Sequence, residues 1–600
     1  MKKMFLIFCF AALPFLAPVL FAQNADIPEI TAAEIQDHIN YLASDEMKGR
    51  FTGSEEAYTA AEYIKSEFER HGLKPAFGDS YIQEYPFIAG IEMTGKNELS
   101  FYISGNESSP KLKEEFTPAP FSGSGDVKAQ LVFAGYGISA QKLEYDDYAG
   151  IDVTDKIVLV MRSQPEYNVP HSKFDEYSSL RYKATVARDK GAAGIIFVNG
   201  YLPENENDKL LDFTYDRASA VEGFPVVQVK RSFVDELFDA NKLSFADYQK
   251  KMIDDKKPAS FEFENVNAKI VTGIKETEKI SWNVAGILEG NDAELKNEYV
   301  VVGGHFDHLG MGETGSLYMG DVPMIHNGAD DNASGTTGVL ELAEKFSSEK
   351  DNLKRSMLFA CFSGEELGLL GSNYFANHPP VEAKQMITMI NLDMIGRLNA
   401  KNELIIYGTG TSSNFKNLLN EKNSYGLSLT FNDEGYGPSD HSSFYGKEIP
   451  VLFFFTGTHS DYHKPSDDAD KINSVGEETV LKYIFDVANK IVTDNSKPDY
   501  LVVERKDTGQ MTGTKVWVGT IPDFAGDVDG YKLSGVTDGS PAAKAGILAG
   551  DIIVKFGEKK ISNIYDFTYA IGDYVPGDKV DVVIVRDEKE MKFNIELGTR

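Results

Sequence analysis

The sequence contains only two cysteines, Cys9 and Cys361, among its 600 residues. Cys9 lies in an N-terminal segment that we expect to be removed, so the mature chain cannot form an internal disulfide. Its stability must then come from the size of the buried core and from any bound metal. Cys361 lies in the apolar run 357–362, which predicts a buried structural thiol and not a nucleophile.

Positive charge is also scarce, since 60 lysines and arginines face 92 acidic residues and leave a net charge of −32. This balance disfavours nucleic acid and anionic membrane surfaces as partners. It suits cationic substrates such as free amino termini, although solubility alone explains it equally well. The hydrophobic content of 42% excludes wholesale disorder, and the length predicts several domains.

Long apolar runs are absent after the N-terminus. Residues 4–21 are apolar, follow Lys2-Lys3, contain two prolines and end at the small Ala22. These features predict a signal peptide over residues 1–22, with a retained membrane anchor as the alternative. We therefore expect an exported protein, periplasmic or secreted, that has no membrane span after cleavage.

The predicted secondary structure of the remaining chain changes from one segment to the next. Residues 23–125 begin with two amphipathic helices, the first capped by Thr31 and Glu34 and the second starting near Ser54. Residues 126–264 are rich in strands, with apolar runs at 131–136, 156–161 and 191–198. This part resembles the protease-associated (PA) domain, which implies a lid or substrate gate; a spacer is the plainer alternative.

Residues 265–497 alternate strands with helices. Apolar runs at 299–303, 356–362, 386–391, 403–407 and 450–455 predict strands, and 334–346 predicts one of the helices between them. The alternation predicts an α/β fold, a three-layer αβα sandwich around a mostly parallel sheet. Ligands of such sheets bind beyond the carboxyl ends of the strands.

The last segment, 508–600, carries the pattern Gly-Ser-Pro-Ala-Ala-Lys-Ala-Gly from Gly539, with Ser540 as a helix cap and Pro541 at the first helical position. It resembles a bacterial PDZ domain. The resemblance implies binding of C-terminal peptides by strand addition along 531–536, opposite a helix at 563–572, with 519–524 as the carboxylate loop. A purely stabilising appendage is an equal alternative.

Five segments of the α/β part carry residues of the types that bind metals. They are His305-Phe306-Asp307, Ala329-Asp330-Asp331-Asn332, Ser363-Gly364-Glu365-Glu366, Asn391-Leu392-Asp393 and Tyr462-His463. Most follow predicted strands, so their side chains are expected to converge. Asp307 is placed to support His305, because residues i and i+2 of a strand share a face. Adjacent acids diverge, so one glutamate can bind metal while its neighbour addresses water.

Taken together, these motifs resemble the co-catalytic zinc aminopeptidase family, which also contains glutamate carboxypeptidases, glutaminyl cyclases and a non-enzymatic receptor. The resemblance covers about 23–125 and 265–497. It implies two Zn²⁺ per chain, for which Mn²⁺ or Co²⁺ could substitute. It also implies that Asp330 bridges the ions, with His305 and Asp393 at one and Glu366 and His463 at the other. Glu365 is then the general acid/base.

The same resemblance gives lower-ranking expectations for the substrate pocket, namely Asp440, His441 and Tyr462. The leading interpretation is an exported zinc metallo-aminopeptidase acting on peptides. A carboxypeptidase-type relative is the rival within the same class, with Arg397 as the candidate for holding a substrate carboxylate. A peptide-binding protein on an inactive scaffold is the rival from another class, although no ligand position of the family pattern is missing.

Overall fold

The computed structural model describes residues 28–600 except 170–171, 203–207, 216–222, 319, 321, 504–515, 523–529, 538, 562–563, 572–573, 575, 587–588 and 600. The predicted signal peptide lies outside the described residues. The chain divides into two compact units. One comprises Met1–Gln83, Asn283–Thr508 and Ile521–Asp527, and the other comprises Glu84–Trp282, Gly509–Thr520 and Val528–Arg600. The second begins before the predicted boundary at 126 and extends beyond 264.

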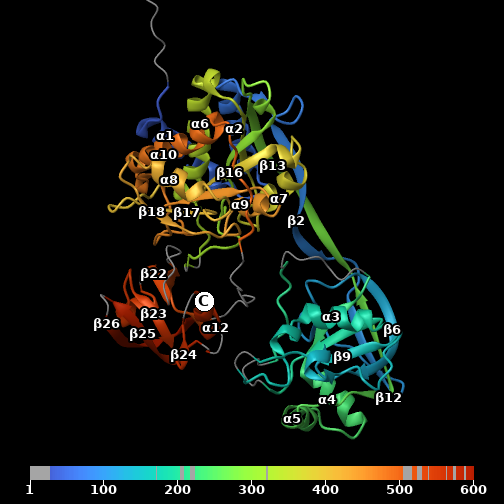
Figure 1. The fold of residues 1–600 in the computed structure, drawn as a ribbon. Helices are drawn as coiled ribbons and strands as arrows, with labels where there is room; N and C mark the ends of the chain where they lie inside the picture. Colours follow the sequence, from blue (N-terminus) through green and yellow to red (C-terminus); the bar gives the residue numbers. More distant parts are fainter. Residues whose placement is uncertain are drawn as a thin grey trace, which may run out of the picture. The chain divides into compact units, whose positions relative to one another are not determined.

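A nine-stranded sheet forms the centre of the first unit (Figure 1). Its order is β1 (Lys74–Pro75), β13 (Ile274–Leu288), β15 (Ser356–Phe362), β14 (Tyr299–His305), β16 (Met386–Leu392), β19 (Val451–Phe455), β17 (Glu403–Tyr407) and β18 (Ser428–Phe431), with β2 (Ile82–Met93) paired to β13. Strands β15, β14, β16 and β19 are mutually parallel. The mostly parallel sheet is thus confirmed at its centre, while β13 and β17 pair antiparallel to its flanks.

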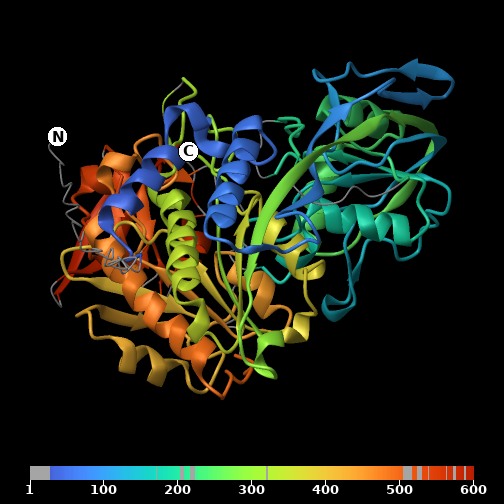
Figure 2. The same ribbon diagram turned by 90° about the horizontal axis from the view of Figure 1, so that it is seen from above.

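Helices cover both faces of this sheet. On one side α1 (Ala32–Leu42), α2 (Glu55–Arg70), α6 (Gly335–Ser348) and α10 (Ser474–Thr493) pack together, and Figure 2 shows them as the blue, yellow-green and orange helices. The other side carries α7 (Leu370–Asn377) and α9 (His441–Tyr445), and α8 (Phe415–Lys422) lies against α10. The rings of β15 point both ways: Phe359 meets Phe346 of α6, and Phe362 meets Phe375 of α7. The three-layer prediction is confirmed.

The predicted helix starts are confirmed at the N-terminus. Thr31 caps α1, with its hydroxyl oxygen accepting from the backbone N–H of Glu34, and Ser54 caps α2 in the same way through Ala57.

Cys361 is fully buried, as the sequence predicts. Among the described residues, none of the helices has the length and apolar character needed to cross a bilayer.

The second unit contains an eight-stranded sheet. Its order is β4 (Asn106–Ser108), β3 (Glu98–Ile103), β12 (Phe261–Thr272), β6 (Gly125–Phe133), β9 (Ile157–Met161), β10 (Gly194–Val198), β11 (Val226–Val229) and β5 (Phe116–Pro118). Short strands β7 (Ser139–Ala140) and β8 (Tyr145–Asp146) and helices α3 (Leu180–Asp189), α4 (Arg231–Ala240) and α5 (Phe245–Asp255) complete it. The strand–helix–strand pattern predicted for this part is therefore present.

The C-terminal segment forms another sheet, in the order β21 (Thr520–Pro522), β22 (Tyr531–Val536), β23 (Ile552–Phe556), β25 (Lys579–Arg586) and β26 (Lys589–Glu596), with β24 (Lys559–Lys560) paired to β23. Strand β20 (Val516–Trp517) pairs with β27 (Gly598–Thr599), and α11 (Pro541–Ala545) and α12 (Ile564–Ile571) accompany them. Strand β22 has neighbours on both sides, so the edge predicted at 531–536 belongs to β21 instead.

Candidate metal centre

The polar segments predicted from the sequence converge at one edge of the central sheet. His305 is the last residue of β14, Glu365 and Glu366 follow β15, Asp393 follows β16, and His463 follows β19. These four strands are parallel, so their carboxyl ends lie at the same edge. All five side chains are brought together there.

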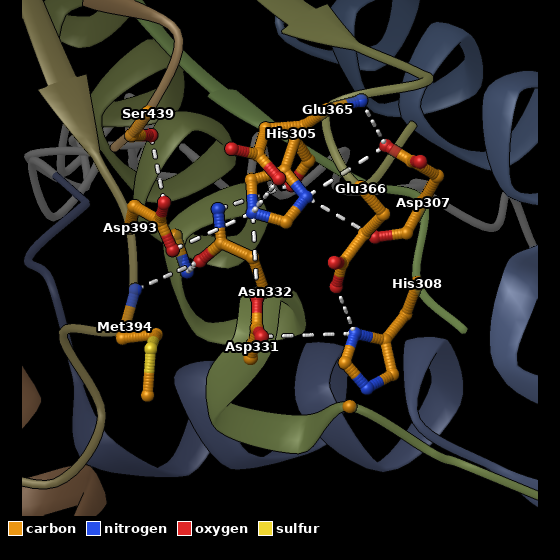
Figure 3. Close-up of polar contacts among 12 residues, drawn as sticks. His305, Asp307, His308, Asp331, Asn332, Glu365, Glu366, Asp393, Met394 and Ser439 are labelled. Atoms are coloured by element: carbon orange, nitrogen blue, oxygen red, sulfur yellow. Dashed lines mark hydrogen bonds and ion pairs between the residues drawn. The ribbon is translucent and has the colours of Figure 1, made fainter. Parts of the chain in front are cut away.

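His305 is 1% exposed and contacts Asp307 and Asp393 (Figure 3). Its Nδ1 lies 3.1 Å from the carbonyl oxygen of Asp307 and donates to it. Its Nε2 lies 3.4 Å from Asp331 Oδ1 and 3.5 Å from Asp393 Oδ1. An imidazole that donates its other N–H to a fixed acceptor is the usual arrangement of a metal ligand.

Asp307 supports His305, as the sequence predicts. Its carbonyl lies 3.1 Å from His305 Nδ1, and its carboxylate Oδ1 lies 3.7 Å from the same nitrogen. The carboxylate accepts from Thr52 Oγ1 at 2.7 Å and from the backbone N–H of Glu365 at 3.2 Å. Asp307 therefore holds the turn that carries Glu365 as well as the ring of His305.

The aspartate at the middle of the cluster is Asp331, where the sequence analysis placed Asp330. Asp331 Oδ1 faces His305 Nε2, and Asp331 Oδ2 lies 3.2 Å from His463 Nε2. One carboxylate thus addresses two histidines from different strand ends, as a ligand bridging two ions requires. The histidines hold the pKa of Asp331 well below its usual range, although burial opposes them.

Asp330 points away from this cluster and stabilises the loop. Its Oδ1 accepts from the backbone N–H of Gly396 at 2.7 Å, and its Oδ2 lies 3.1 Å from His459 Nε2. Adjacent residues in a turn direct their side chains apart, so only one of the two acids can face the cluster. The carboxylate of Asp467 accepts from the N–H groups of both Asp330 and Asp331, which fixes this division. The peptide bond between Asp331 and Asn332 is cis.

His463 and Glu366 lie on the far side of Asp331 from His305. His463 Nδ1 donates to the carbonyl of Gly315 at 2.9 Å, and its Nε2 lies 3.3 Å from Glu366 Oε2. Burial favours the neutral acid, yet His463 and His308 lower the pKa of Glu366 to about 2. Glu366 is therefore an anionic donor.

A third imidazole, which the sequence analysis did not single out, reaches the same carboxylates. His308 Nδ1 lies 2.7 Å from Glu366 Oε1 and 3.8 Å from Asp331 Oδ2 (Figure 3). Its position three residues after His305 was a signal that could have drawn attention to it, because the strand ends at His305 and the chain turns beyond it. His459 was likewise missed.

Glu365 differs from its neighbour in charge state. Burial and the carboxylates of Glu366 and Asp393 raise the pKa of Glu365 well above its usual range, against the opposing effect of His305. Its Oε2 lies 4.0 Å from His305 Nε2. Two adjacent glutamates with oppositely shifted pKa values can perform different tasks, one as ligand and one as proton carrier.

The residues expected to line the pocket lie behind or beside the cluster. Tyr462 stacks on His463 with ring centroids 3.9 Å apart, and it packs against the buried apolar group around Met394 and Phe455. Asp440 and His441 are fully buried, and His441 stacks on Phe453 at 4.7 Å. Burial lowers the pKa of His441 to about 3, so it is a neutral packing residue. Within the part of the chain that the structure describes, neither Asp440 nor His441 belongs to a group of side chains spaced to hold a metal ion.

Arg50 ties the two ligand loops together from a distant part of the sequence. Its guanidinium is fully buried and donates to the carbonyls of Phe306 at 2.7 Å, Asn327 at 2.8 Å and Gly328 at 3.0 Å, and also to Leu42. The first carbonyl lies next to His305, and the other two precede Asp330 and Asp331. The turn that carries Arg50, Asp45–Arg50, enters so closely that a Cβ at Gly49 would lie 2.3 Å from the carbonyl of His326.

Two groups of donors have the spacing of a metal site. One is His305, Asp331 and Asp393, and the other is His308, Asp331 and Glu366. Within each group the donor atoms lie within 4.8 Å of one another, and Asp331 is common to both. The donors are nitrogen and oxygen without thiolate, which suits zinc in a catalytic site. Asp393 Oδ1 has no hydrogen-bond partner among the described residues, as expected of an atom reserved for an ion.

Comparison with family models identifies the parts of the chain. Residues 283–488 match peptidase family M28, residues 127–237 match the PA domain, and residues 519–597 match the PDZ domain. Each match covers part of the chain: peptidase family M28 the α/β part, the PA domain part of the strand-rich segment, and the PDZ domain the C-terminal segment. All three resemblances expected from the sequence are confirmed.

Curated relatives resemble part of this chain. A probable leucine aminopeptidase 2 of Arthroderma benhamiae is 29% identical over 189 residues, which are 30% of this chain and 34% of the relative. The leupeptin-inactivating enzyme 1 of Streptomyces exfoliatus is 31% identical over 191 residues, which are 32% and 39% of the two chains. The chain thus spans between a third and two fifths of the length of these relatives.

Solved structures that resemble the chain include an aminopeptidase from Aneurinibacillus sp. strain AM-1. It is 24% identical, with a TM-score of 0.45, and the match covers 80% of this chain and 97% of that one. A zinc aminopeptidase from Bacillus subtilis is 22% identical with a TM-score of 0.41, covering 78% and 97%.

Proposed function

We propose that this protein is an exported zinc aminopeptidase that removes N-terminal residues from peptides, using two metal ions. One ion is held by His305, Asp331 and Asp393, and the other by Asp331, Glu366 and His463. The observation that carries the proposal is the position of Asp331, whose two carboxylate oxygens face histidines from different strand ends, His305 and His463. The relatives named as leucine aminopeptidases support the reaction class.

Metal ions bound here would polarise the scissile carbonyl and lower the pKa of an attacking water toward about 7. The protein's part in proton transfer falls to Glu365, whose carboxylate takes the proton from the water and gives it to the leaving amine. The raised pKa of Glu365 makes its carboxylate a stronger base than an ordinary glutamate. Asp307 fixes its backbone. Mn²⁺ or Co²⁺ fits the same donors.

The charges around the site favour an amino terminus over a carboxyl terminus as the recognised end. Arg397, the candidate for holding a substrate carboxylate, is already paired with Asp461 at 2.6 Å and donates to the carbonyl of Lys471. The cluster itself is rich in carboxylates, which attract an α-ammonium group. The carboxypeptidase alternative therefore lacks a free cation at the residue proposed for it.

A panel of small substrates tests this proposal. Leucine p-nitroanilide should be hydrolysed, its N-acetyl derivative should not, and a blocked peptide with a free carboxyl terminus should be inert. Dialysis against a chelator should abolish hydrolysis and zinc should restore it. Hydrolysis of the N-acetylated substrate at an equal rate would contradict the aminopeptidase assignment, and inertness in both metal states would favour a peptide-binding protein.

The accessory parts have proposed roles of their own. Cleavage after residue 22 would release the protein for export, and the boundaries at 125, 264, 497 and 508 are proposed domain limits. The PA domain is proposed to gate the site. The PDZ domain is proposed to bind a C-terminal peptide along the edge strand β21, opposite α12. Titration with free-acid and amidated forms of one peptide tests the last point, because equal binding of both would rule it out.

A further inference from the structure

His308 is the residue in the metal centre whose role the proposed function leaves open. It is 0% exposed, yet neither of its ring nitrogens makes an aligned hydrogen bond among the described residues. Buried polar atoms are nearly always paired, so an imidazole in this state needs an explanation. Its Nδ1 is nevertheless only 2.7 Å from Glu366 Oε1.

His308, Asp331 and Glu366 form one of the groups whose donor atoms are spaced to hold an ion. Two donors that each lie 2.0–2.2 Å from one tetrahedral zinc ion are about 3.3–3.6 Å apart. His308 Nδ1 and Glu366 Oε1 are 2.7 Å apart, so they need to separate only slightly to bind one ion. Asp331 Oδ2 lies 3.8 Å from the same nitrogen, so three donors surround one position.

His463 and His308 contact different oxygens of Glu366, so both imidazoles can approach the same ion. His463 approaches Glu366 through Oε2, while His308 approaches it through Oε1. The two rings are edge to face, with centroids 5.9 Å apart and planes at 72°. Glu366 thus presents one oxygen to each histidine, and Asp331 Oδ2 is near both.

The backbone beside His308 is shaped to admit the ring. Gly328 has a φ of +57°, in the left-handed region that favours glycine. A Cβ at this position would lie 2.5 Å from both Cγ and Cδ2 of His308. Any side chain at Gly328 would therefore displace the imidazole or the loop that leads into Asp331.

We propose that His308 is a ligand of the second metal ion, which is then held by two imidazoles, His308 and His463, together with Asp331 and Glu366. This inference rests on the two-metal proposal and extends it. It makes the two sites unequal, because the site of His305, Asp331 and Asp393 has one imidazole only. The ion with two imidazoles should be the last to leave during chelation.

The first test measures the number of zinc ions bound by the full-length protein and the affinity for each. Apoprotein is titrated with Zn²⁺ against a chromophoric chelator, for the wild type, His308→Gln and His326→Gln. His326 is the matched control: it is buried in the same segment, but its ring nitrogens already contact Ser316 Oγ and the carbonyl of Met324. We expect His308→Gln to weaken one of two equivalents by more than about 100-fold, beyond the 10–100-fold typical of outer-sphere partners, and His326→Gln to change neither by more than threefold.

The second test needs no variant, so it holds even if His308→Gln folds poorly. A crystal structure of the wild-type protein with excess Zn²⁺ should place His308 Nδ1 at 2.0–2.1 Å from the ion that Glu366 binds. A separation beyond about 3 Å, or a loss below tenfold in the titration, overturns the inference while leaving two zinc ions in place. Wild-type protein that binds no zinc at all would instead remove the proposed function, and this inference with it.

Discussion

Arg50 and Gly328 are joined by a hydrogen bond of 3.0 Å, from the guanidinium Nη2 to the carbonyl oxygen. Through the same side chain Gly328 is tied to Phe306, which accepts from Arg50 Nε at 2.7 Å. The carbonyls belong to the two loops that carry His305 and Asp331. A single buried cation therefore sets the spacing of these loops, and its charge offsets part of the surrounding acid.

Replacing Arg50 by lysine should weaken zinc binding as well as stability. Lysine keeps the charge but lacks the planar fork with which Arg50 reaches four carbonyls. We expect a loss of about 2–4 kcal/mol in unfolding free energy and of roughly 10–100-fold in zinc affinity. Thermal unfolding and chelator competition measure the two effects.

Arg355 provides the matched control for Arg50. It is 1% exposed and holds Glu298 and the carbonyls of Ile491, Asp494 and Asn495. Arg355→Lys should destabilise the fold to a similar degree and leave zinc affinity unchanged in protein that remains folded. An equal loss of zinc affinity in both variants would show that the effect of Arg50 is general destabilisation.

Replacing Asp330 and Asp331 by asparagine, one at a time, should show which of the two binds metal and which stabilises the loop. Asp331→Asn removes charge facing both His305 and His463, so bound zinc should fall and kcat/KM should drop by about 10³-fold or more, equivalent to about 4 kcal/mol. Asp330→Asn should keep both zinc ions, because its contacts are with Gly396 and His459. The zinc content and kcat/KM of the two variants test this assignment. Loss of zinc from Asp330→Asn but not from Asp331→Asn would show that Asp330 is the bridging ligand.

Replacing Glu365 by glutamine should remove proton transfer and spare the metal. General acid–base catalysis contributes about 10²–10⁴-fold, so kcat should fall by that amount with zinc content unchanged. Glu366→Gln should lower zinc content instead, since Glu366 faces His463 and His308 as an anion. Near-normal turnover by Glu365→Gln would show that another group carries the proton.

A buried acid away from the site predicts a pH-dependent stability. Glu341 of α6 is 2% exposed, and burial, helped by two neighbouring acids, raises its pKa to about 8. The charged and titratable groups that face it are Glu34, His38, Arg70, Glu344 and Glu477. Between about pH 4.5 and 8 the native protein holds a proton that the unfolded chain has released, so stability falls as the pH rises.

Glutamine at position 341 mimics the protonated acid and avoids this loss. Glu341→Gln should match the wild type near pH 4 and exceed it at pH 9 by about 1 kcal/mol or more, which is roughly 2–4 °C in Tm for a domain of this size. Thermal melts at the two pH values measure the difference. An advantage of the variant that is the same at both would show that Glu341 does not titrate in this window.

Much of the site was accessible from the sequence because it follows strand ends. His305, Glu365, Glu366, Asp393 and His463 were identified from their positions after apolar runs, and parallel pairing brings them together. The choice between Asp330 and Asp331 was not accessible in this way, since it depends on which carboxylate Gly396 and His459 engage. Spacing along the chain does not show such contacts.

Other features depend on contacts between distant segments. Arg50 lies 256 residues before Phe306, and no local pattern links the two. The sequence analysis placed the PDZ edge at 531–536, whereas the short β21 occupies the outer position. Periodicity predicts that a strand exists, but its neighbours are set by how the whole sheet packs.

The distance in sequence between Arg50 and its acceptors has a consequence for biogenesis. The turn Asp45–Arg50 leaves the ribosome well before the loops that it clamps have been made. At about 5–20 residues per second, its guanidinium waits roughly 13–50 s for the carbonyl of Phe306. Throughout that interval the nascent N-terminal helices carry an arginine destined for the interior, and the peptidase domain is completed only after the intervening PA segment has emerged.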